Sequence, residues 1–171
     1  MAGGYFELLG LPERFEIDAA LLERAYLERS RETHPDRFAS APASERVAAV
    51  QRSIELNDAY RTLKKAVPRA EYLMSRAGVT IGDNERSADH DFLMRILALR
   101  EELADARAAG RTEEVAALER AMLGHHNQLV GSLPAKFAAG DLAAIKQTLI
   151  ELRYVDRYLQ ECDAALDDDA V

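Results

Sequence analysis

The sequence contains a single cysteine, Cys162, which excludes an internal disulfide and any Cys-x-x-Cys metal or redox pair. It also lacks an apolar run near the ~20 residues of a membrane span. Its first residues resemble neither a signal peptide nor an Arg-rich amphipathic leader. The net charge of -8 argues against a general nucleic-acid surface, because phosphate binding needs a basic excess. We therefore expect a soluble cytoplasmic protein with no membrane and no nucleic-acid partner.

No stretch alternates apolar and polar residues as a strand does, and apolar residues instead recur every three or four positions. The predicted fold class is therefore all-α. Residues 79–88 carry no period and are rich in helix breakers, so they predict a connection between two helical regions. We predict an N-terminal domain over residues 1–78, a linker over 79–88 and a C-terminal domain over 89–171.

The N-terminal region predicts two long helices joined by a loop of about ten residues, which should pack antiparallel. Asp18 is a suitable N-cap for the first helix, and Ser44 is one for the second. The predicted core face of the second helix runs through Val47, Val50 and Ile54, then drifts to Leu56, Tyr60 and Leu63. Short helices are expected over residues 5–9, before Gly10, and over 69–77, after Pro68.

The C-terminal region predicts three helices in series, and the short turns between them imply an antiparallel bundle. The helices are expected to start near Ser87 or Asp89, at Thr112 and at Asp141. Pro134 should kink or end the second of them, since proline removes a helical hydrogen bond. The acidic run Asp167 to Asp169 is expected to begin a disordered tail.

The loop between the two N-terminal helices contains His34, Pro35 and Asp36. A proline discourages helix in the residues before it, so the preceding helix should stop near His34. Arg24, Arg31 and Arg37 flank the loop, with Arg29 as a further basic side chain, and the set makes a compact polar recognition surface. The alternative is a simple turn or an N-cap, because three residues alone are a weak motif.

The first helix of the C-terminal region has two apolar faces. At about 100° per residue, Phe92, Ile96, Leu99 and Leu103 fall in one narrow arc, which predicts the core stripe. The second face lies roughly opposite and comprises Leu93, Met94 and Leu97, continued by Glu101 and Asp105. Either this face is covered by the linker or the N-terminal domain, or it is exposed and binds a partner.

Three motifs at these spacings resemble a J domain: the opening Tyr5-Phe6-Glu7-Leu8-Leu9-Gly10, the His34-Pro35-Asp36 loop, and the helical segment from Leu56 to Leu63. A longer pattern is similar to the HscB family of iron-sulfur cluster co-chaperones. It comprises Asp36-Arg37-Phe38-Ala39, Arg69-Ala70-Glu71-Tyr72-Leu73, Phe92-Leu93-Met94 and Leu99-Arg100-Glu101-Glu102-Leu103. The resemblance extends from about Tyr5 to Ala165. It implies an N-terminal J domain followed by a C-terminal three-helix bundle.

In that family the His-Pro-Asp loop and the basic helix before it engage a specialised Hsp70, HscA, and stimulate its ATPase, while the bundle holds the cluster scaffold IscU. The resemblance therefore implies two partners, no resident cofactor and no metal site. The implied Hsp70-binding residues are Arg24, Arg31, His34, Pro35, Asp36 and Arg37. The implied scaffold-binding residues are Leu93, Met94, Leu97, Glu101, Asp105 and Tyr154.

Three positions depart from the family pattern. Arg37 stands where lysine is common, which keeps the charge and changes the donor geometry. Ala98 replaces an acidic residue of some relatives, and Asp105 is a shortened acid, so the electrostatic part of the scaffold interface is expected to be weaker. The chain also lacks the N-terminal cysteine pairs of some eukaryotic relatives, which agrees with a bacterial-type member.

Two alternatives compete with this interpretation. A general J protein could carry a different client, although the chain has no Gly/Phe-rich linker and no Cys-x-x-Cys zinc repeats. An enzyme could use His34 with Asp36, or His125 and His126 with Cys162. Adjacent histidines point about 100° apart on a helix and no set of three or four metal ligands is evident, so no catalytic residue is predicted. Self-association is possible and nothing in the sequence indicates it.

Overall fold

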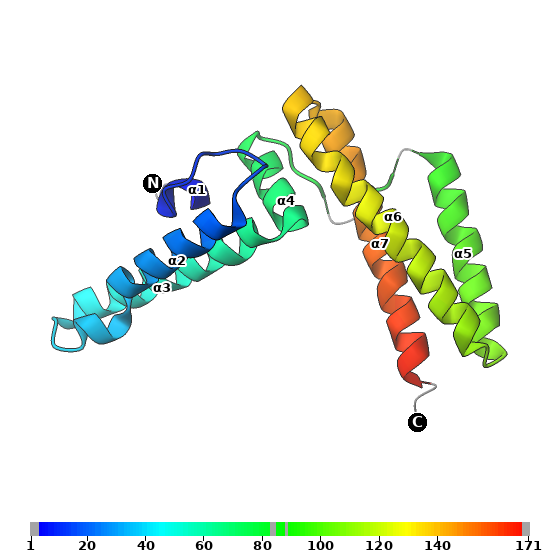
Figure 1. Ribbon diagram of the computed structural model, residues 1–171, viewed down its shortest axis with the longest axis horizontal. Coiled ribbons are helices and arrows are strands. Elements are labelled where there is room, and N and C mark those ends of the chain that lie inside the picture. The colour runs from blue at the N-terminus through cyan, green and yellow to red at the C-terminus, as the bar shows by residue number, and fades with distance from the viewer. Residues whose placement is uncertain (1–3, 83–84, 88, 169–171) are drawn as a thin grey trace. The chain divides into compact units, whose positions relative to one another are not determined.

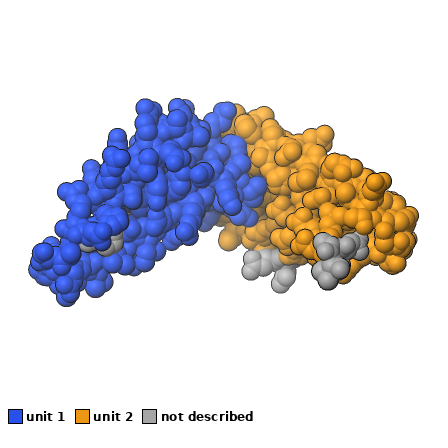
Figure 2. Space-filling view, turned by 60° about the horizontal axis from the view of Figure 1, so that its bottom comes forward, with its two compact units in different colours: residues 1–76 blue, residues 77–171 orange. Residues whose placement is uncertain are grey.

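The computed structural model describes residues 4–82, 85–87 and 89–168, and within these ranges every regular element is a helix. The predicted all-α fold class is confirmed for this part of the chain. The chain divides into two compact units, residues 1–76 and 77–171 (Figures 1 and 2). Each unit is described by itself, and the limits 1–78, 79–88 and 89–171 stay a prediction.

The first unit is a helical hairpin with short helices at either end. Its elements are α1 (Tyr5–Leu8), α2 (Ala19–Thr33), the 3-10 turn η1 (Pro35–Phe38), α3 (Ala43–Lys64) and α4 (Ala66–Arg76). Helices α2 and α3 run antiparallel, with η1 in the loop at their far end (Figure 1). The carboxylate of Asp18 accepts hydrogen bonds from the backbone N–H groups of Ala20 and Leu21, so the predicted cap of α2 is confirmed.

Aromatic and apolar contacts hold the hairpin together. The rings of Tyr26 and Tyr60 stack with centroids 4.1 Å apart. The Tyr26 hydroxyl donates to Asn57 Oδ1 at 2.8 Å, which ties α2 to α3 a second time. The buried core of this unit includes Phe6, Leu9, Leu22, Leu56 and Leu63. Together these contacts fix the position of the loop that α2 and α3 carry.

The predicted core face of α3 is wrong over its first three turns. Val47, Val50 and Ile54 are 69%, 46% and 49% exposed, whereas Ala49 is buried. The prediction relied on the large apolar side chains, which here lie on the solvent face. The buried residue is a small alanine, which lets α3 pack closely. The later part of the prediction holds for Leu56 and Leu63, which are both buried, and Tyr60 is half-buried.

Two helix starts in this unit also differ from expectation. Pro42 is the N-cap of α3, and its carbonyl accepts from the N–H groups of Glu45 and Arg46, so Ser44 lies inside the helix and caps nothing. Helix α4 begins at Ala66, three residues before its predicted start at Arg69. Pro68 lies in the first turn of α4, where a missing N–H costs no helical hydrogen bond.

The second unit contains three long helices, α5 (His90–Ala108), α6 (Thr112–Ala139) and α7 (Leu142–Asp168). Asp89 caps α5 by accepting from the N–H of Phe92 at 3.0 Å. The Asp141 carboxylate accepts from the N–H of Ala144 at 2.9 Å at the start of α7. Gly140 closes α6 at φ 68°, a left-handed conformation that glycine adopts without strain.

Two expectations about this unit need correction. Helix α6 continues through Pro134 and ends at Ala139, so the proline does not end it, and the kink at this position stays a prediction. Proline removes only one helical hydrogen bond, and the neighbouring Leu133 is fully buried, so packing holds the helix across this position. Asp167 and Asp168 are the last residues of α7 and not part of a disordered tail. Asp169 lies outside the described residues.

The core of the second unit includes the sole cysteine. Cys162 is fully buried on α7, together with Val155 and Tyr158 of the same helix. Burial raises the pKa of the Cys162 thiol to about 11, so the thiol is protonated at neutral pH. The hydroxyl of Tyr158 donates to the backbone carbonyl of Leu99, 3.2 Å away, which links α7 to α5.

Among the described residues, no helix combines the length and the apolar character that crossing a membrane demands.

Candidate functional site

The His34 loop joins the end of α2 to η1. His34 is the C-cap of α2 in an extended conformation, with φ -60° and ψ 127°, as expected for a residue before proline. The backbone then turns through η1, whose first residues are Pro35 and Asp36. The side chains of His34 and Asp36 are 55% and 90% exposed. Local backbone geometry therefore presents an imidazole and a carboxylate to solvent together.

The Nδ1 atom of His34 has two possible partners, and both belong to Asp36. It accepts from the Asp36 backbone N–H at 3.3 Å, and it lies 3.5 Å from the Asp36 carboxylate. A neutral imidazole with its proton on Nε2 makes the first contact, whereas a protonated imidazole donates to the carboxylate. In the neutral form the Nε2–H group can donate a hydrogen bond.

The predicted basic residues lie in two places: Arg37 is in the loop itself, and Arg24 and Arg31 are on α2. Arg37 donates from its guanidinium to the carbonyl of Arg31 at 3.3 Å, so η1 and the last turn of α2 are joined. Arg24 and Arg31 are both exposed and lie on one face of α2, since they are seven residues apart. Arg24 is about 15 Å along the helix from His34, at 1.5 Å per residue. Arg29 pairs with Glu32 at 3.7 Å.

The predicted second surface lies on α5 in the other unit. Met94 and Leu97 are 52% and 54% exposed, and Glu101 and Asp105 follow them, also exposed. The predicted core stripe of α5 is confirmed, because Phe92, Ile96 and Leu103 are buried and Leu99 packs against the same core. Leu93 is intermediate: it is partly buried and packs against the bundle core. The outward face of α5 is therefore apolar at its start and acidic toward its end.

Tyr154 belongs to α7 and reaches this region through Phe92. The two rings meet edge to face, with centroids 5.9 Å apart and an interplanar angle of 86°. Tyr154 is partly buried and packs on the same core cluster as Leu93. Phe92 is itself 3% exposed and is a fixed support for both residues.

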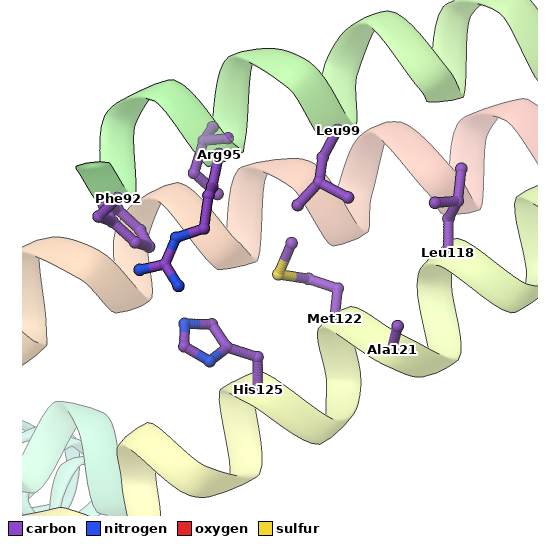
Figure 3. Close-up of a pocket in the computed structure, with 8 residues that line it drawn as sticks. Phe92, Arg95, Leu99, Leu118, Ala121, Met122 and His125 are labelled. Carbon is purple, nitrogen blue, oxygen red and sulfur yellow. The ribbon is translucent and has the colours of Figure 1, made fainter. Parts of the chain in front are cut away.

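A groove of about 170 Å³ lies between α5 and α6. Figure 3 shows the side chains of Phe92, Leu99 and Met122 in this gap, with Arg95 extending from α5 toward His125 of α6. The ring of His125 is 6.3 Å from that of Phe92. The lining holds two basic side chains and no carboxylate or thiol, so it offers no acid–base pair of the kind catalysis uses.

Of the two sets of residues considered for an enzyme, His34 and Asp36 lie together, with Nδ1 3.5 Å from the carboxylate, whereas His125, His126 and Cys162 do not meet. His126 faces Asp156 at 3.5 Å, His125 lines the groove, and Cys162 is enclosed in the core. Within residues 4–82, 85–87 and 89–168, no group of three or more His, Cys, Asp or Glu side chains is arranged to hold a metal ion.

Sequence reasoning missed the residues that connect the start of α5 to α7. Three side chains of α7 contact residues before α5: Arg153 contacts the carbonyls of Ile81 and Gly82, Lys146 contacts Glu85, and Gln147 contacts Ser87. Their spacing along α7 gives no signal, since charged residues at such positions usually lie on a solvated face. The contact between Phe92 and Tyr154 was also not predicted, because Phe92 was assigned to the core and Tyr154 to the scaffold-binding residues.

Comparison with known proteins gives consistent matches over most of the chain. A family model described as the HSCB C-terminal oligomerisation domain matches residues 88–163. The co-chaperone protein HscB homolog of Aeromonas salmonicida is 41% identical, covering 93% of this chain and 94% of its own. The homolog of Azoarcus is 36% identical, covering 95% of this chain and 93% of its own.

Solved structures agree with these sequence matches. The chaperone HscB from Vibrio cholerae is similar with a TM-score of 0.83 at 32% identity, over 97% of this chain and 99% of that one. The human co-chaperone protein HscB is similar with a TM-score of 0.85 at 25% identity, over 95% of this chain and 82% of that one.

Proposed function

Because this chain belongs to the HscB family of co-chaperones, with an N-terminal J domain and a C-terminal three-helix bundle, we propose that it delivers an iron-sulfur cluster scaffold to an Hsp70. The scaffold would be IscU and the chaperone HscA, whose ATPase the protein would stimulate during maturation of iron-sulfur proteins. The proposed role is that of an adaptor with no covalent chemistry of its own. It would act in the cytoplasm.

The observation that carries this proposal is the presence of two chemically different surfaces on two separate compact units. The His34 loop is polar, exposed and basic at its edges. The α5 surface is apolar, with an acidic end. An adaptor needs one surface for each partner, and surfaces of different chemistry prevent the partners from exchanging places.

The chaperone side would use His34 and Asp36 for directional hydrogen bonds, with Pro35 fixing the turn and Arg24, Arg31 and Arg37 supplying attraction and orientation. ATP hydrolysis takes place in the partner. Stimulation then requires that the loop bind the two states of the chaperone with different affinity, because only differential affinity moves an equilibrium. The exposure of His34 and Asp36 supports this role, since neither side chain is committed to packing.

The scaffold side would use Met94 and Leu97 as apolar anchors, with Leu93 and Tyr154 next to them and Glu101 and Asp105 at the polar rim. The exposure of Met94 and Leu97 supports a docking role over a core role. Met94 is a flexible thioether, which adapts to a partner surface at low cost. Ala98 offers no charge in this surface, so apolar burial is expected to dominate its affinity.

Steady-state ATP hydrolysis by the cognate specialised Hsp70 tests the proposal, with this protein and the scaffold added separately and together. We expect synergistic stimulation that His34→Gln abolishes, because glutamine cannot reproduce the imidazole contacts. His90→Gln is the matched control, since His90 is an exposed histidine at the start of α5. Scaffold binding by His34→Gln should equal that of the wild type.

Other outcomes lead to different functions. Stimulation that is indifferent to the scaffold would retain the J-domain role and make the protein a general adaptor for another Hsp70 client. Loss of both activities in a folded His34→Gln variant would contradict the division into two sites.

A second copy of this chain is the alternative partner for the α5 surface, because the matching family model is described as an oligomerisation domain. Concentration-dependent sedimentation that Leu97→Ala suppresses would favour that partner.

A further inference from the structure

The residues that precede α5 are attached to α7 by a guanidinium. Arg153 donates from one nitrogen to the carbonyl of Gly82 at 3.0 Å and from another to the carbonyl of Ile81 at 3.5 Å. Both contacts lie within the unit of residues 77–171. Backbone carbonyls are the acceptors, so this attachment depends on where the chain runs and not on which side chains it carries there.

A half-buried ion pair also attaches this segment to α7. Lys146 Nζ lies 2.6 Å from Glu85 Oε1, and the two side chains are 31% and 34% exposed. The other carboxylate oxygen of Glu85 accepts from the backbone N–H of Gly82 at 3.1 Å. The hydrogen bond from Lys146, followed by the one from Gly82, lowers the pKa of Glu85. The carboxylate thus closes a small turn and binds that turn to α7.

A third attachment continues into α5. Ser87 is 5% exposed, and its hydroxyl oxygen accepts from Gln147 Nε2 at 2.6 Å and from the backbone N–H of Asp89 at 3.1 Å. Asp89 in turn caps α5 through the N–H of Phe92. The contacts from α7 therefore reach the helical turn that carries Leu93 and Met94.

We infer that Ile81, Gly82, Glu85 and Ser87 form a strap bound to α7, which leaves only residues 77–80 as the connection between the first unit and the part of the chain attached to α7. This inference deepens the proposed function and rests on it, because the strap would determine how closely a bound scaffold is tethered to the J domain. Arg153, Lys146 and Gln147 act as positioning residues in this arrangement.

The length of this connection sets the strength of the tether. Four residues, 77–80, span at most about 14 Å when fully extended. Loss of the Arg153 and Lys146 contacts would lengthen the connection to the ten residues 77–86, because Ser87 stays bound to Gln147. Effective concentration falls roughly as the -3/2 power of tether length, so the scaffold would be presented to the chaperone about fourfold more weakly.

Amide hydrogen exchange on the full chain tests the strap directly. In the double variant Arg153→Ala with Lys146→Ala we expect the N–H groups of Gly82 and Glu85 to exchange roughly tenfold faster, because their supporting hydrogen bonds are lost. Arg157→Ala is the matched control, an exposed arginine one turn later on α7. Exchange in the double variant as slow as in this control would overturn the strap. Glu85→Gln, which removes the same ion pair from the other side, should accelerate exchange in the same direction if the double variant is poorly folded.

The ATPase assay tests the functional consequence. At sub-saturating protein, the double variant should retain the stimulation given without scaffold and its affinity for the scaffold, while the synergistic part falls about fourfold. Full synergy alongside accelerated exchange would overturn the tether role. If the wild type itself fails to stimulate the Hsp70, the proposed function is wrong, and the exchange experiment still decides whether the strap exists.

Discussion

The His34 loop and the α5 surface are built in opposite ways. The loop presents polar side chains, 55% and 90% exposed for His34 and Asp36, on a backbone that short-range hydrogen bonds hold in place. The α5 surface lies directly on a packed core, and one of its members, Leu93, belongs partly to that core. A recognition loop of this kind can change without cost to the fold, whereas an apolar docking surface shares residues with the structure that supports it.

The largest difference is expected from the exposed members of the α5 surface. Met94→Ala with Leu97→Ala should weaken scaffold binding by about 10- to 100-fold, because truncated apolar anchors typically cost 1.4 to 2.8 kcal/mol at an interface. Titration calorimetry measures the affinity, and a thermal melt should be unchanged. Leu123→Ala is the control, since Leu123 is an exposed leucine of α6. A melting point that falls sharply would assign Met94 and Leu97 to the fold.

A smaller effect separates Leu93 from its neighbours. Leu93→Ala should lower the free energy of unfolding by about 1 to 2 kcal/mol, less than the 2 to 5 kcal/mol of a fully buried leucine, because it is only partly enclosed. Urea denaturation provides the measurement. If Leu93→Ala were as stable as Leu97→Ala, Leu93 would lie wholly outside the core. The α5 surface could then be changed without cost to the fold, as the loop can.

The smallest effect concerns pH and the strap. The pKa of Glu85 is lowered in the folded protein, so its ion pair with Lys146 is present above the unfolded value of about 4.3 and is lost as pH falls through the folded value. We expect the Gly82 N–H to lose protection, relative to its intrinsic exchange rate, as the pH falls through the lowered pKa of Glu85. Glu85→Gln should abolish this pH dependence. Protection that persists in acid for the wild type would contradict the assigned partner.

Much of the fold was predictable because helix signals are local. Asp18 and Asp89 cap the helices that follow them, and the glycine at 140 closes α6 as its conformational freedom allows. The face of α3 was not predictable, since burial of Ala49 in place of Val47 depends on how closely α2 approaches. Similarly, nothing local to Pro134 says that packing of Leu133 carries the helix past it.

The two surfaces were predictable to different degrees. The exposure of Met94 and Leu97 follows from angles on one helix, because that helix needs only one buried stripe. The role of Leu93 depends on the neighbouring helices and could not be read from α5 alone. The strap was invisible for the same reason: Arg153 and Gly82 are 71 residues apart and meet only in three dimensions.

The burial of Cys162 has a consequence for the cargo of the proposed pathway. Iron-sulfur clusters are held by thiolates, so any exposed, ionised cysteine on an adaptor would compete with the scaffold for the iron. This chain has one thiol, which is enclosed in the bundle core and has a pKa of about 11. In the proposed function, this adaptor would therefore approach a loaded scaffold without offering a competing ligand to its cluster.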